Sequence, residues 1–573
     1  MQKRFLRYAV LLLGWLTLLA AGPADPVFAD PDAEMLRRIR SRISAETKSI
    51  MAGASQEEME DVIGFYALRQ ERRAWTHADG WSDAGREAIA CIGAASRDGL
   101  DPEQYHYSRL LAMEPSLRNG PSRSEPPFDW DLLLTHGLTR LLRHLSYGRV
   151  NPDRLDDQWS APKPASRDIA SLAASAADSG RVREVVEAIL PTHPGYARLR
   201  EALVLYRDIQ RNGGWPLVPS GDGIRPGESD PRIPVVRRRM AVTDGPLPVS
   251  SKNPNTYDTA LIDAVKRFQV RNGIAPDGVL GSKTIQAMNV PVENRIQQIL
   301  LNLERWRWLG QDWGKRYIAV NIANYSLEAV EDGKTLLNMR VVVGQTYRRT
   351  PVFSERLRYI ILNPYWNVPK KIAVEDKLPL IKKDPGYLIK NRIHVFSARG
   401  EENGPEINPY TIDWSKLHAD YFPYRLKQDP GDRNALGRIK FLLPNKYAIY
   451  LHDSPQRELF RRTSRGFSSG CIRLEKPIEL AVEVMKNVPE WNRERILQTI
   501  QSGITTVIPV KESIMVHLLY WTAWADEQGV VHFREDIYDR DRPLWVALQD
   551  AGSRTSDPKS IFMGELVVQP GSS

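Results

Sequence analysis

The periodicity of the apolar residues changes once along this 573-residue chain, and that change limits the fold more than any other feature. Between residues 46 and 214 apolar residues recur at every third or fourth position, which is typical of helices with one buried face. One such face consists of Tyr196, Leu199, Leu203 and Tyr206. From Tyr317 onward, β-branched and aromatic residues gather in short runs that predict strands, at 317–322, 339–343 and 359–362. We therefore expect a multidomain α+β protein with a helical first part and a mixed β-sheet in its last part.

The first 29 residues have the composition of an export signal. Three basic residues, Lys3, Arg4 and Arg7, precede an apolar run at 9–20, and the small residues around Ala29 are typical of a cleavage site. An uncleaved membrane anchor is the alternative, although the run is shorter than the ~20 residues that a spanning helix needs. Cleavage would lower the formal net charge from +9 to +7, because three cations and one carboxylate leave.

The composition excludes several functional classes. A moderate positive charge suits an anionic polymer or a membrane surface, and it also suits an ordinary soluble protein. The chain has no dense Lys/Arg tract with interleaved aromatic residues, so we expect no nucleic-acid partner. The ten histidines include no His-x-x-x-His or His-x-His pair, which disfavours a zinc peptidase. We expect no metal and no cofactor.

A cysteine and a histidine in the strand-rich part stand in a pattern that suits catalysis. His452 follows the apolar run 447–451, so we expect it at a strand end, where a base is held rigidly. Nineteen residues later Cys471 follows the small residues Ser468, Ser469 and Gly470. Small residues leave backbone N–H groups uncovered, which suits an oxyanion hole. If the segment is extended, Arg473 shares a face with Cys471, where a cation favours thiolate and attracts a carboxylate.

Each of these residues also has an ordinary structural interpretation. A cysteine can be an inert, small buried residue, and a histidine at a strand end can be a hydrogen-bonded structural residue. Cys91 is the second of the two cysteines, and in an oxidising compartment the two could form a disulfide, which would consume the candidate nucleophile.

The segment His452 to Arg473, with Ser469-Gly470-Cys471-Ile472-Arg473, resembles the active-site signature of the L,D-transpeptidases. Most members have a histidine where this chain has Ser469, whereas the longer Gram-negative members resemble it in having Ser-Ser-Gly-Cys. Three further segments are similar to that long branch: Asn363-Pro364-Tyr365-Trp366-Asn367-Val368-Pro369, the run from Pro430 to Gly437, and Asp536-Ile537-Tyr538.

The resemblance implies a division of the chain into a helical scaffold, a three-helix peptidoglycan-binding module and an L,D-transpeptidase catalytic domain with an inserted lid. The module would use the helical segment that carries Leu261, Val265 and Phe268 on one face, followed by a helix that Ser282 could cap. The expected boundaries are 1–29 for the signal peptide, 30–230 for the scaffold, 231–292 for the module, 293–365 and 430–552 for the catalytic domain, 366–429 for the lid, and 553–573 for a C-terminal tail.

The resemblance also implies a reaction, namely a 3→3 cross-link between peptidoglycan stem peptides through a thioester, with release of D-alanine. Cys471 would be the nucleophile and His452 the proton carrier, which the main chain of Asp453 orients. The N–H groups of Gly470 and Cys471 would bind the oxyanion. The expected substrate-binding residues are Arg473, Tyr450, Ser469 and Trp366, with a core role as the alternative for Trp366.

Three alternatives to cross-linking stay open at the sequence level: hydrolysis of the stem to a tripeptide, attachment or release of a lipoprotein lysine, and a wall-binding scaffold without enzymatic activity. The expected partners are peptidoglycan stem peptides and glycan, with carbapenem β-lactams as inhibitors. The expected location is the periplasm, peripheral to the cell wall.

Overall fold

The computed structural model describes residues 37–39, 41, 42, 44–77, 80–118, 127–160, 164–249, 253–399 and 404–553. The expected signal peptide and all but the first residue of the expected C-terminal tail lie outside the described residues. The described residues form two compact units: the first takes those up to 92, those in 105–140 and those in 168–185, and the second takes those in 93–104, those in 141–167 and those from 186 onward. None of the described helices combines the length and the apolar character that a bilayer span needs.

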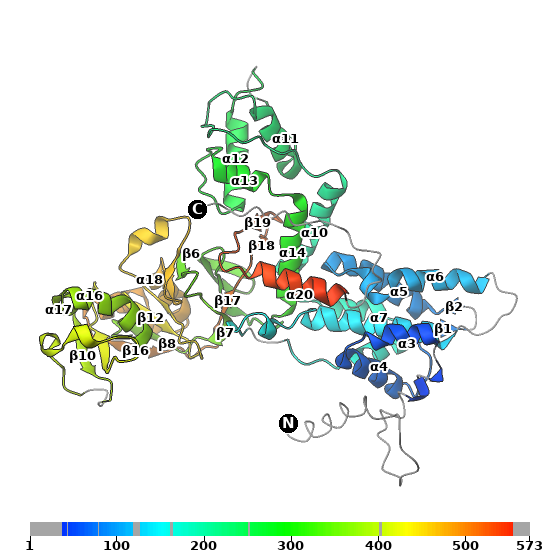
Figure 1. Ribbon diagram of the computed structural model, residues 1–573, viewed down its shortest axis with the longest axis horizontal. Coiled ribbons are helices and arrows are strands. Elements are labelled where there is room, and N and C mark those ends of the chain that lie inside the picture. Colours follow the sequence, from blue (N-terminus) through cyan, green and yellow to red (C-terminus); the bar gives the residue numbers. More distant parts are fainter. Residues whose placement is uncertain are drawn as a thin grey trace, which may run out of the picture. The chain divides into compact units, whose positions relative to one another are not determined.

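The first unit is helical, as the periodicity predicts (Figure 1). In α4 (Gln56–Leu68), Ser55 and Glu58 form a reciprocal capping box, which satisfies backbone N–H groups at the start of the helix. A methyl group on Gly64 of α4 would lie 2.9 Å from Ala170 Cβ of α8, so glycine permits the close approach of the two helices. The other helices that lie wholly or mainly in this unit are α3 (Ala45–Ala52), α5 (Asp83–Ala94), α6 (Tyr107–Arg118), α7 (Phe128–Tyr147), α8 (Ile169–Ser179) and α9 (Val182–Ala188).

The second unit begins with helices that form two apolar clusters. In α10 (Pro194–Arg211) the predicted face is buried and packs against α14 (Val292–Arg307), which confirms that interpretation. In α12 (Thr259–Arg271) the predicted face is buried against α11 (Ile233–Asp244) and α13 (Ser282–Met288). The predicted cap was wrong: Gly281 occupies the N-cap position and Ser282 is the first helical residue.

The last part of this unit is built on a mixed sheet, as predicted. Its strand order is β16-β8-β12-β13-β15-β6-β5-β4-β17-β7-β3, and β14 also pairs with β6. The strands are β3 (Trp159–Ser160), β4 (Arg316–Asn321), β5 (Ser326–Glu331), β6 (Lys334–Gly344), β7 (Val352–Arg356), β8 (Tyr359–Leu362), β12 (Ile439–Leu442), β13 (Leu451–His452), β14 (Gly466–Ser468), β15 (Ile472–Leu474), β16 (Thr506–Pro509) and β17 (Met515–Leu519). A separate hairpin joins β18 (Ala523–Ala525) to β19 (Val531–Phe533).

Helices on this part of the unit complete its core. They are α18 (Pro477–Met485), α19 (Arg493–Gln501) and α20 (Asp541–Ser553). Leu480, Ile496 and Leu544, one from each helix, belong to the same buried cluster as the strand residues Val341, Phe441 and Ile472. This cluster covers one face of the central strands.

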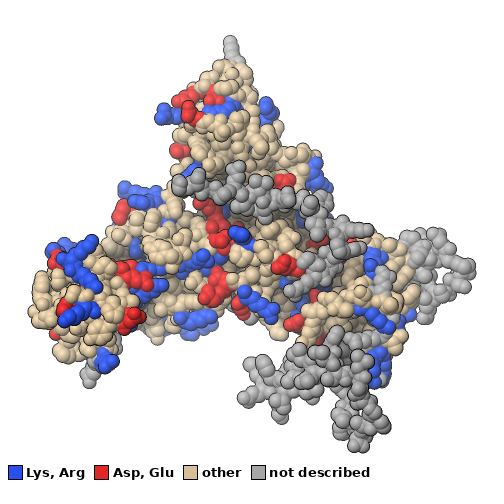
Figure 2. Space-filling view, viewed as in Figure 1, with Lys and Arg blue, Asp and Glu red and all other residues tan. Residues whose placement is uncertain are grey.

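Residues 366–429, which we call the capping insertion, form a lobe with its own core (Figure 1). The lobe contains a three-stranded sheet in the order β10-β11-β9, with β9 (Trp366–Val368), β10 (Ile393–Ser397) and β11 (Tyr424–Gln428). Its helical segments include η5 (Ala373–Lys377), α16 (Leu378–Lys383) and α17 (Gly386–Lys390). Figure 2 shows Lys and Arg side chains interspersed with Asp and Glu over the viewed face of this lobe. An inserted subdomain is therefore present, as expected.

The two ends of the capping insertion are tied together by asparagine side chains. Asn434 is fully buried, and its Nδ2 donates to the carbonyls of Pro364 (3.0 Å) and Asp429 (2.8 Å). Asn363 has a φ of 48°, a left-handed conformation that asparagine tolerates, and its Nδ2 donates to Thr499 O at 2.9 Å. Asn434 thus joins the two ends of the insertion, which we call its hinges, and Asn363 joins the first end to α19.

Candidate active site

Neighbouring strands β12, β13 and β15 carry the polar residues of the candidate site on one face. In the strand register Lys440 pairs with His452, and His452 pairs with Arg473. Side chains alternate along a strand, so the intervening residues turn to the opposite face. These residues are Ile439, Phe441, Leu451 and Ile472, which are all buried in the core cluster. Cys471 lies one residue before β15, two residues from Arg473, and so belongs to the site face.

The segment before His452 differs from the prediction. Residues 447–451 were predicted as a strand, but only Leu451 and His452 are in β13. The side chain of Asn445 accepts from Tyr447 N (3.0 Å) and Ile449 N (3.1 Å), and Ala448 has a φ of 54°. A local turn therefore replaces the first part of the strand, and it directs Ala448 O toward the Cys471 thiol, 4.0 Å away.

Cys471 is a partly buried thiol. Burial raises the pKa of Cys471, while the backbone of Tyr450, the Lys440 ammonium, the Tyr450 side chain and the Arg473 guanidinium act in the opposite direction. Burial prevails, so the thiol is protonated near neutral pH and needs a proton acceptor before it can attack. Among the described residues, none of the hydrogen bonds joins Cys471 to His452 in this state.

Glycine is required at position 470 by the backbone. Gly470 has a φ of 115°, a region that L-residues with a side chain rarely adopt, and a Cβ there would lie 3.2 Å from Ile449 Cδ1. Its N–H donates to Ser468 Oγ at 3.1 Å, and its carbonyl accepts from Thr350 Oγ1 at 2.8 Å. The N–H of Gly470 is thus engaged, whereas that of Cys471 donates to no described residue.

His452 is buried and neutral. Its Nδ1 lies 2.5 Å from the carbonyl oxygen of Asp453, which fixes the proton on Nδ1 and leaves Nε2 unprotonated. Burial, together with the positive charge of Arg473, lowers the pKa of His452 to about 3, even though the carbonyls of Asp453 and Leu436 act in the opposite direction. A neutral imidazole on the site face can accept a proton.

The Asp453 carboxylate has a structural role in the turn after β13. Its Oδ2 accepts from Arg438 N (2.9 Å) and its Oδ1 from Ser454 N (2.7 Å). Gly437 has a φ of 63°, and a Cβ at that position would collide with the Asp453 side chain. The main chain of Asp453, rather than its carboxylate, therefore contacts His452.

Tyr450 connects the thiol to the capping insertion. Burial raises the pKa of the Tyr450 phenol well above its usual value, and its contact with the Cys471 side chain raises it further, while a hydrogen bond with Trp366 lowers it. Trp366 is 6% exposed and belongs to the core of the insertion, and Tyr450 packs against that core. The structure therefore places Trp366 within reach of Tyr450 but mainly inside the lobe.

Lys440 is a site residue that sequence reasoning missed. Its Nζ lies 3.9 Å from the centre of the Tyr450 ring, and burial lowers the pKa of Lys440 while the nearby Cys471 raises it. Across the described residues it has no carboxylate partner. Its position between the buried Ile439 and Phe441 is the signal that could have identified it, because a lysine at a central strand position must face a polar region.

Arg473 and Ser469 lie where the nucleophile segment meets other elements. Arg473 donates to Gln456 Oε1 at 2.5 Å, and its Nε is buried without a hydrogen-bond partner among the described residues. Ser469 Oγ accepts from Arg348 Nη1 at 2.7 Å. Arg348, in the loop after β6, is a second residue that the sequence did not single out.

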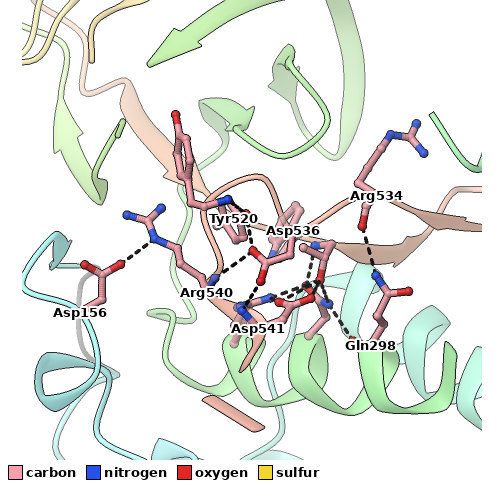
Figure 3. A network of polar contacts seen from close by, with 12 residues as sticks. Asp156, Gln298, Tyr520, Arg534, Asp536, Arg540 and Asp541 are labelled. Carbon is pink, nitrogen blue, oxygen red and sulfur yellow. Dashed lines mark hydrogen bonds and ion pairs between the residues drawn. The ribbon is translucent and has the colours of Figure 1, made fainter. Parts of the chain in front are cut away.

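The segment Asp536-Ile537-Tyr538 contacts the loop after β6 that carries Arg348. Asp536 accepts from the Tyr520 hydroxyl (2.6 Å) and from the N–H groups of Arg540 (2.9 Å) and Asp541 (2.6 Å), as Figure 3 shows. Tyr538 Oη donates to Gly344 O at 2.7 Å and accepts from Thr350 N at 3.2 Å. Since Thr350 holds Gly470 O, this network indirectly positions the turn before Cys471.

A cavity of about 370 Å³ lies in the second compact unit, apart from the candidate site. Its lining includes Trp159, Arg305, Arg349 and Arg540 but none of the predicted site residues. Asp156, which also lines it, forms an ion pair with Arg540 at 2.6 Å (Figure 3). In the described part of the chain, no group of three or more His, Cys, Asp or Glu is arranged to hold a metal ion.

A mixed sheet with a thiol and a neutral imidazole on one face defines a class of domain, and comparison with known families specifies it. Residues 315–506 match the family model described as "L,D-transpeptidase catalytic domain". Residues 246–288 match a "Putative peptidoglycan binding domain", and residues 60–203 match a "Scaffold domain". The chain therefore contains an L,D-transpeptidase catalytic domain, a peptidoglycan-binding domain and a scaffold domain.

Individual proteins agree with this assignment. A protein of Haemophilus influenzae (strain ATCC 51907 / DSM 11121 / KW20 / Rd), named "Putative L,D-transpeptidase", is 37% identical over 301 residues, which are 51% of this chain and 60% of that protein. The aligned region thus spans less than two thirds of the relative.

Two solved structures are also similar to parts of the chain. The crystal structure of the L,D-transpeptidase (residues 123-326) from Xylanimonas cellulosilytica DSM 15894 has a TM-score of 0.17 at 13% identity, covering 52% of this chain and 99% of that one. The L,D-transpeptidase from Mycobacterium smegmatis has a TM-score of 0.15 at 12% identity, covering 36% and 58%. These TM-scores are too low to support the fold, so the fold is described from the strands of this chain alone.

Proposed function

We propose that the protein is a peptidoglycan L,D-transpeptidase that forms 3→3 cross-links between stem peptides through a thioester on Cys471. The observation that carries this proposal is the shared site face, on which the thiol lies beside a neutral His452 and two cations. Neither Lys440 nor Arg473 forms an ion pair with a described carboxylate. Such a face suits a substrate that carries carboxylates, as a stem peptide does.

In the first step, Cys471 attacks the carbonyl carbon of the stem residue that precedes the terminal D-alanine. His452 Nε2 accepts the thiol proton, and the positive charges of Lys440 and Arg473 favour the thiolate. The side chains of Cys471 and His452 are not hydrogen-bonded to each other, and such catalytic contacts commonly tighten when substrate binds. The bond from the carbonyl carbon to the D-alanine nitrogen then breaks, and the imidazolium returns its proton to the departing amine.

The oxyanion of this step needs donors near the attacked carbonyl. The N–H of Cys471 is available, whereas Gly470 N–H donates to Ser468 Oγ and would have to exchange partners. Ser469 N–H also donates to no described residue, so we assign the oxyanion first to the N–H groups of Ser469 and Cys471. This assignment modifies the predicted role of Gly470, whose conformation shapes the turn.

In the second step, the side-chain amine of another stem attacks the thioester carbonyl. The C–S bond breaks, the new amide is the cross-link, and Cys471 regains a proton. The peptidoglycan-binding domain supports the wall polymer as the partner, and the signal-like residues 1–29 support export to the periplasm. Carbapenems, which present a carbonyl to the same thiol, would acylate Cys471.

The test is to incubate the mature protein with purified disaccharide-tetrapeptide and to analyse the products by mass spectrometry. A dimer that has lost D-alanine, absent with Cys471→Ala and present with the matched Cys91→Ala control, supports the proposal. Tripeptide without dimer would instead identify a hydrolase. Product formation only when a lipoprotein carboxyl-terminal lysine is supplied would identify a ligase. A dimer formed equally by Cys471→Ala would overturn the assignment of the nucleophile.

A further inference from the structure

Arg348 lies between the nucleophile segment and the capping insertion and contacts both. Its Nη1 donates to Ser469 Oγ at 2.7 Å and to Asp376 Oδ2 at 2.6 Å. Its Nη2 donates to Asp376 Oδ1 at 2.6 Å and to Glu375 Oε2 at 2.7 Å. Asp376 and Glu375 are both in η5 of the capping insertion, so one guanidinium joins the insertion to the residue two positions before Cys471.

The loop that carries Arg348 is fixed against the nucleophile segment at three points. Gln345 N donates to Ser468 O at 3.0 Å, Thr350 Oγ1 donates to Gly470 O at 2.8 Å, and Arg348 reaches Ser469. The Arg348 side chain is only 9% exposed, and its Nε is buried with no hydrogen-bond partner among the described residues. The guanidinium therefore contacts the nucleophile segment through Ser469 and the insertion through Asp376.

The acidic partners of Arg348 in the insertion are more exposed to water than the guanidinium. The side chains of Glu375 and Asp376 are 46% and 38% exposed, and their carboxylates bind Arg348 and no other described residue. Ion pairs with one exposed partner contribute little to stability, because water and salt screen them. A bidentate pair between a guanidinium and a carboxylate is also the geometry by which arginine recognises carboxylate ligands.

We propose that Arg348 is a carboxylate-binding residue of the substrate site, and that Glu375 and Asp376 occupy it in this structure as internal competitors. A carboxylate of the stem peptide would displace Asp376 from the guanidinium and thereby release η5 from the nucleophile segment. The proposal rests on the proposed function for the identity of the carboxylate. It also gives a role to Ser469, whose hydroxyl keeps Arg348 next to the nucleophile segment.

The test compares two reagents that alkylate the Cys471 thiol and differ in charge, iodoacetate and iodoacetamide. Their rate ratio at Cys471, followed by peptide mass spectrometry on the full mature chain, reports an available cation independently of transpeptidation. The variant Glu375→Gln/Asp376→Asn should raise the iodoacetate-to-iodoacetamide ratio about fivefold, the effect of one charge some 4 Å away in water. Arg348→Gln should lower the ratio below that of the wild type.

The matched controls remove equal charge nearby. Asp384→Asn/Asp420→Asn takes two carboxylates from the same insertion, and Arg349→Gln removes the neighbouring exposed cation; both should leave the ratio within twofold of the wild type. An equal ratio in the wild type, Glu375→Gln/Asp376→Asn and Arg348→Gln would overturn the proposal. So would an equal response of the two double variants.

A second measurement separates this proposal from the proposed function. With disaccharide-tetrapeptide, Glu375→Gln/Asp376→Asn should lower KM severalfold for the free acid and leave KM for the amidated stem unchanged. Cross-linking with an unchanged KM and an unchanged alkylation ratio would refute the role of Arg348 and keep the transpeptidase. A shifted alkylation ratio without any cross-linking would keep the anion site and refute the transpeptidase.

Discussion

Burial disfavours the charged thiolate form of Cys471. Two cations, Lys440 in β12 and Arg473 in β15, favour the thiolate. The reactivity of the thiol therefore depends on residues that would make no covalent contribution. Burial keeps His452 neutral, so its Nε2 lone pair is free for the thiol proton, and the same burial weakens the imidazole as a base. The unfolded chain binds the His452 proton near pH 6.5 and the folded chain only near pH 3. The stability linked to His452 is thus fully present above pH 6.5 and is lost as the pH falls toward 3.

At this scale we predict that Lys440→Met moves the alkylation of Cys471 by iodoacetamide to higher pH. The thiol pKa is already raised by burial, and loss of the Lys440 charge removes one of the groups that lower it. At pH 7.5 the alkylation rate should fall about threefold to fivefold, the effect of one unit charge a few ångströms away. The rate is measured as a function of pH by peptide mass spectrometry.

Lys446→Met is the matched control, because Lys446 is exposed and lies over the Tyr447 ring instead. It should leave the pH dependence of alkylation unchanged. Coinciding curves for Lys440→Met and the wild type would contradict the role of Lys440.

The elements around the site explain what the sequence could and could not predict. Strong periodic signals were sufficient for α12, with Leu261, Val265 and Phe268 buried, and for β8, whose bounds match the predicted run. The run 447–451 misled because its apolar composition suits a strand while Asn445 and Ala448 impose a turn.

The sequence could not predict the site residues that come from distant segments, and the reason is the folded arrangement of the chain. The segment from His452 to Arg473 is contiguous enough for its spacing to indicate chemistry. Lys440 and Arg348 enter the site only through the strand register and a loop contact, which single-sequence patterns do not specify. The hydrogen bond that engages Gly470 N–H is likewise a property of the folded turn.

At the scale of elements we predict that Asn434→Ala loosens the capping insertion. The substitution leaves the buried carbonyls of Pro364 and Asp429 without their donor, which costs about 1–3 kcal/mol each at most. Limited proteolysis should cut the insertion severalfold faster, and the melting temperature should fall by a few degrees.

Asp168→Ala provides the comparison, because Asp168 caps α8 in the first compact unit. Its loss should cost about 1 kcal/mol of stability without faster cleavage in the insertion. Equal cleavage rates in the two variants would show that Asn434 does not hold the hinge.

For the molecule as a whole, the three matched domains suggest a division of labour. The peptidoglycan-binding domain would retain the enzyme on its polymeric substrate, and the catalytic domain would act on the stems that come within reach. Retention raises the local concentration of donor and acceptor stems, which matters when both must reach one thiol. The acidic residues of the capping insertion contact Arg348 at the nucleophile segment, and the insertion would add a second level of control if a stem carboxylate displaces them.

The central claim is that one thioester on Cys471 carries the acyl group, and intact-protein mass spectrometry after brief mixing with disaccharide-tetrapeptide tests it most directly. We predict an adduct equal in mass to the substrate minus D-alanine, mapped to Cys471, present in Cys91→Ala and removed by added acceptor amine. An adduct on another residue, or turnover by Cys471→Ala, would contradict the account.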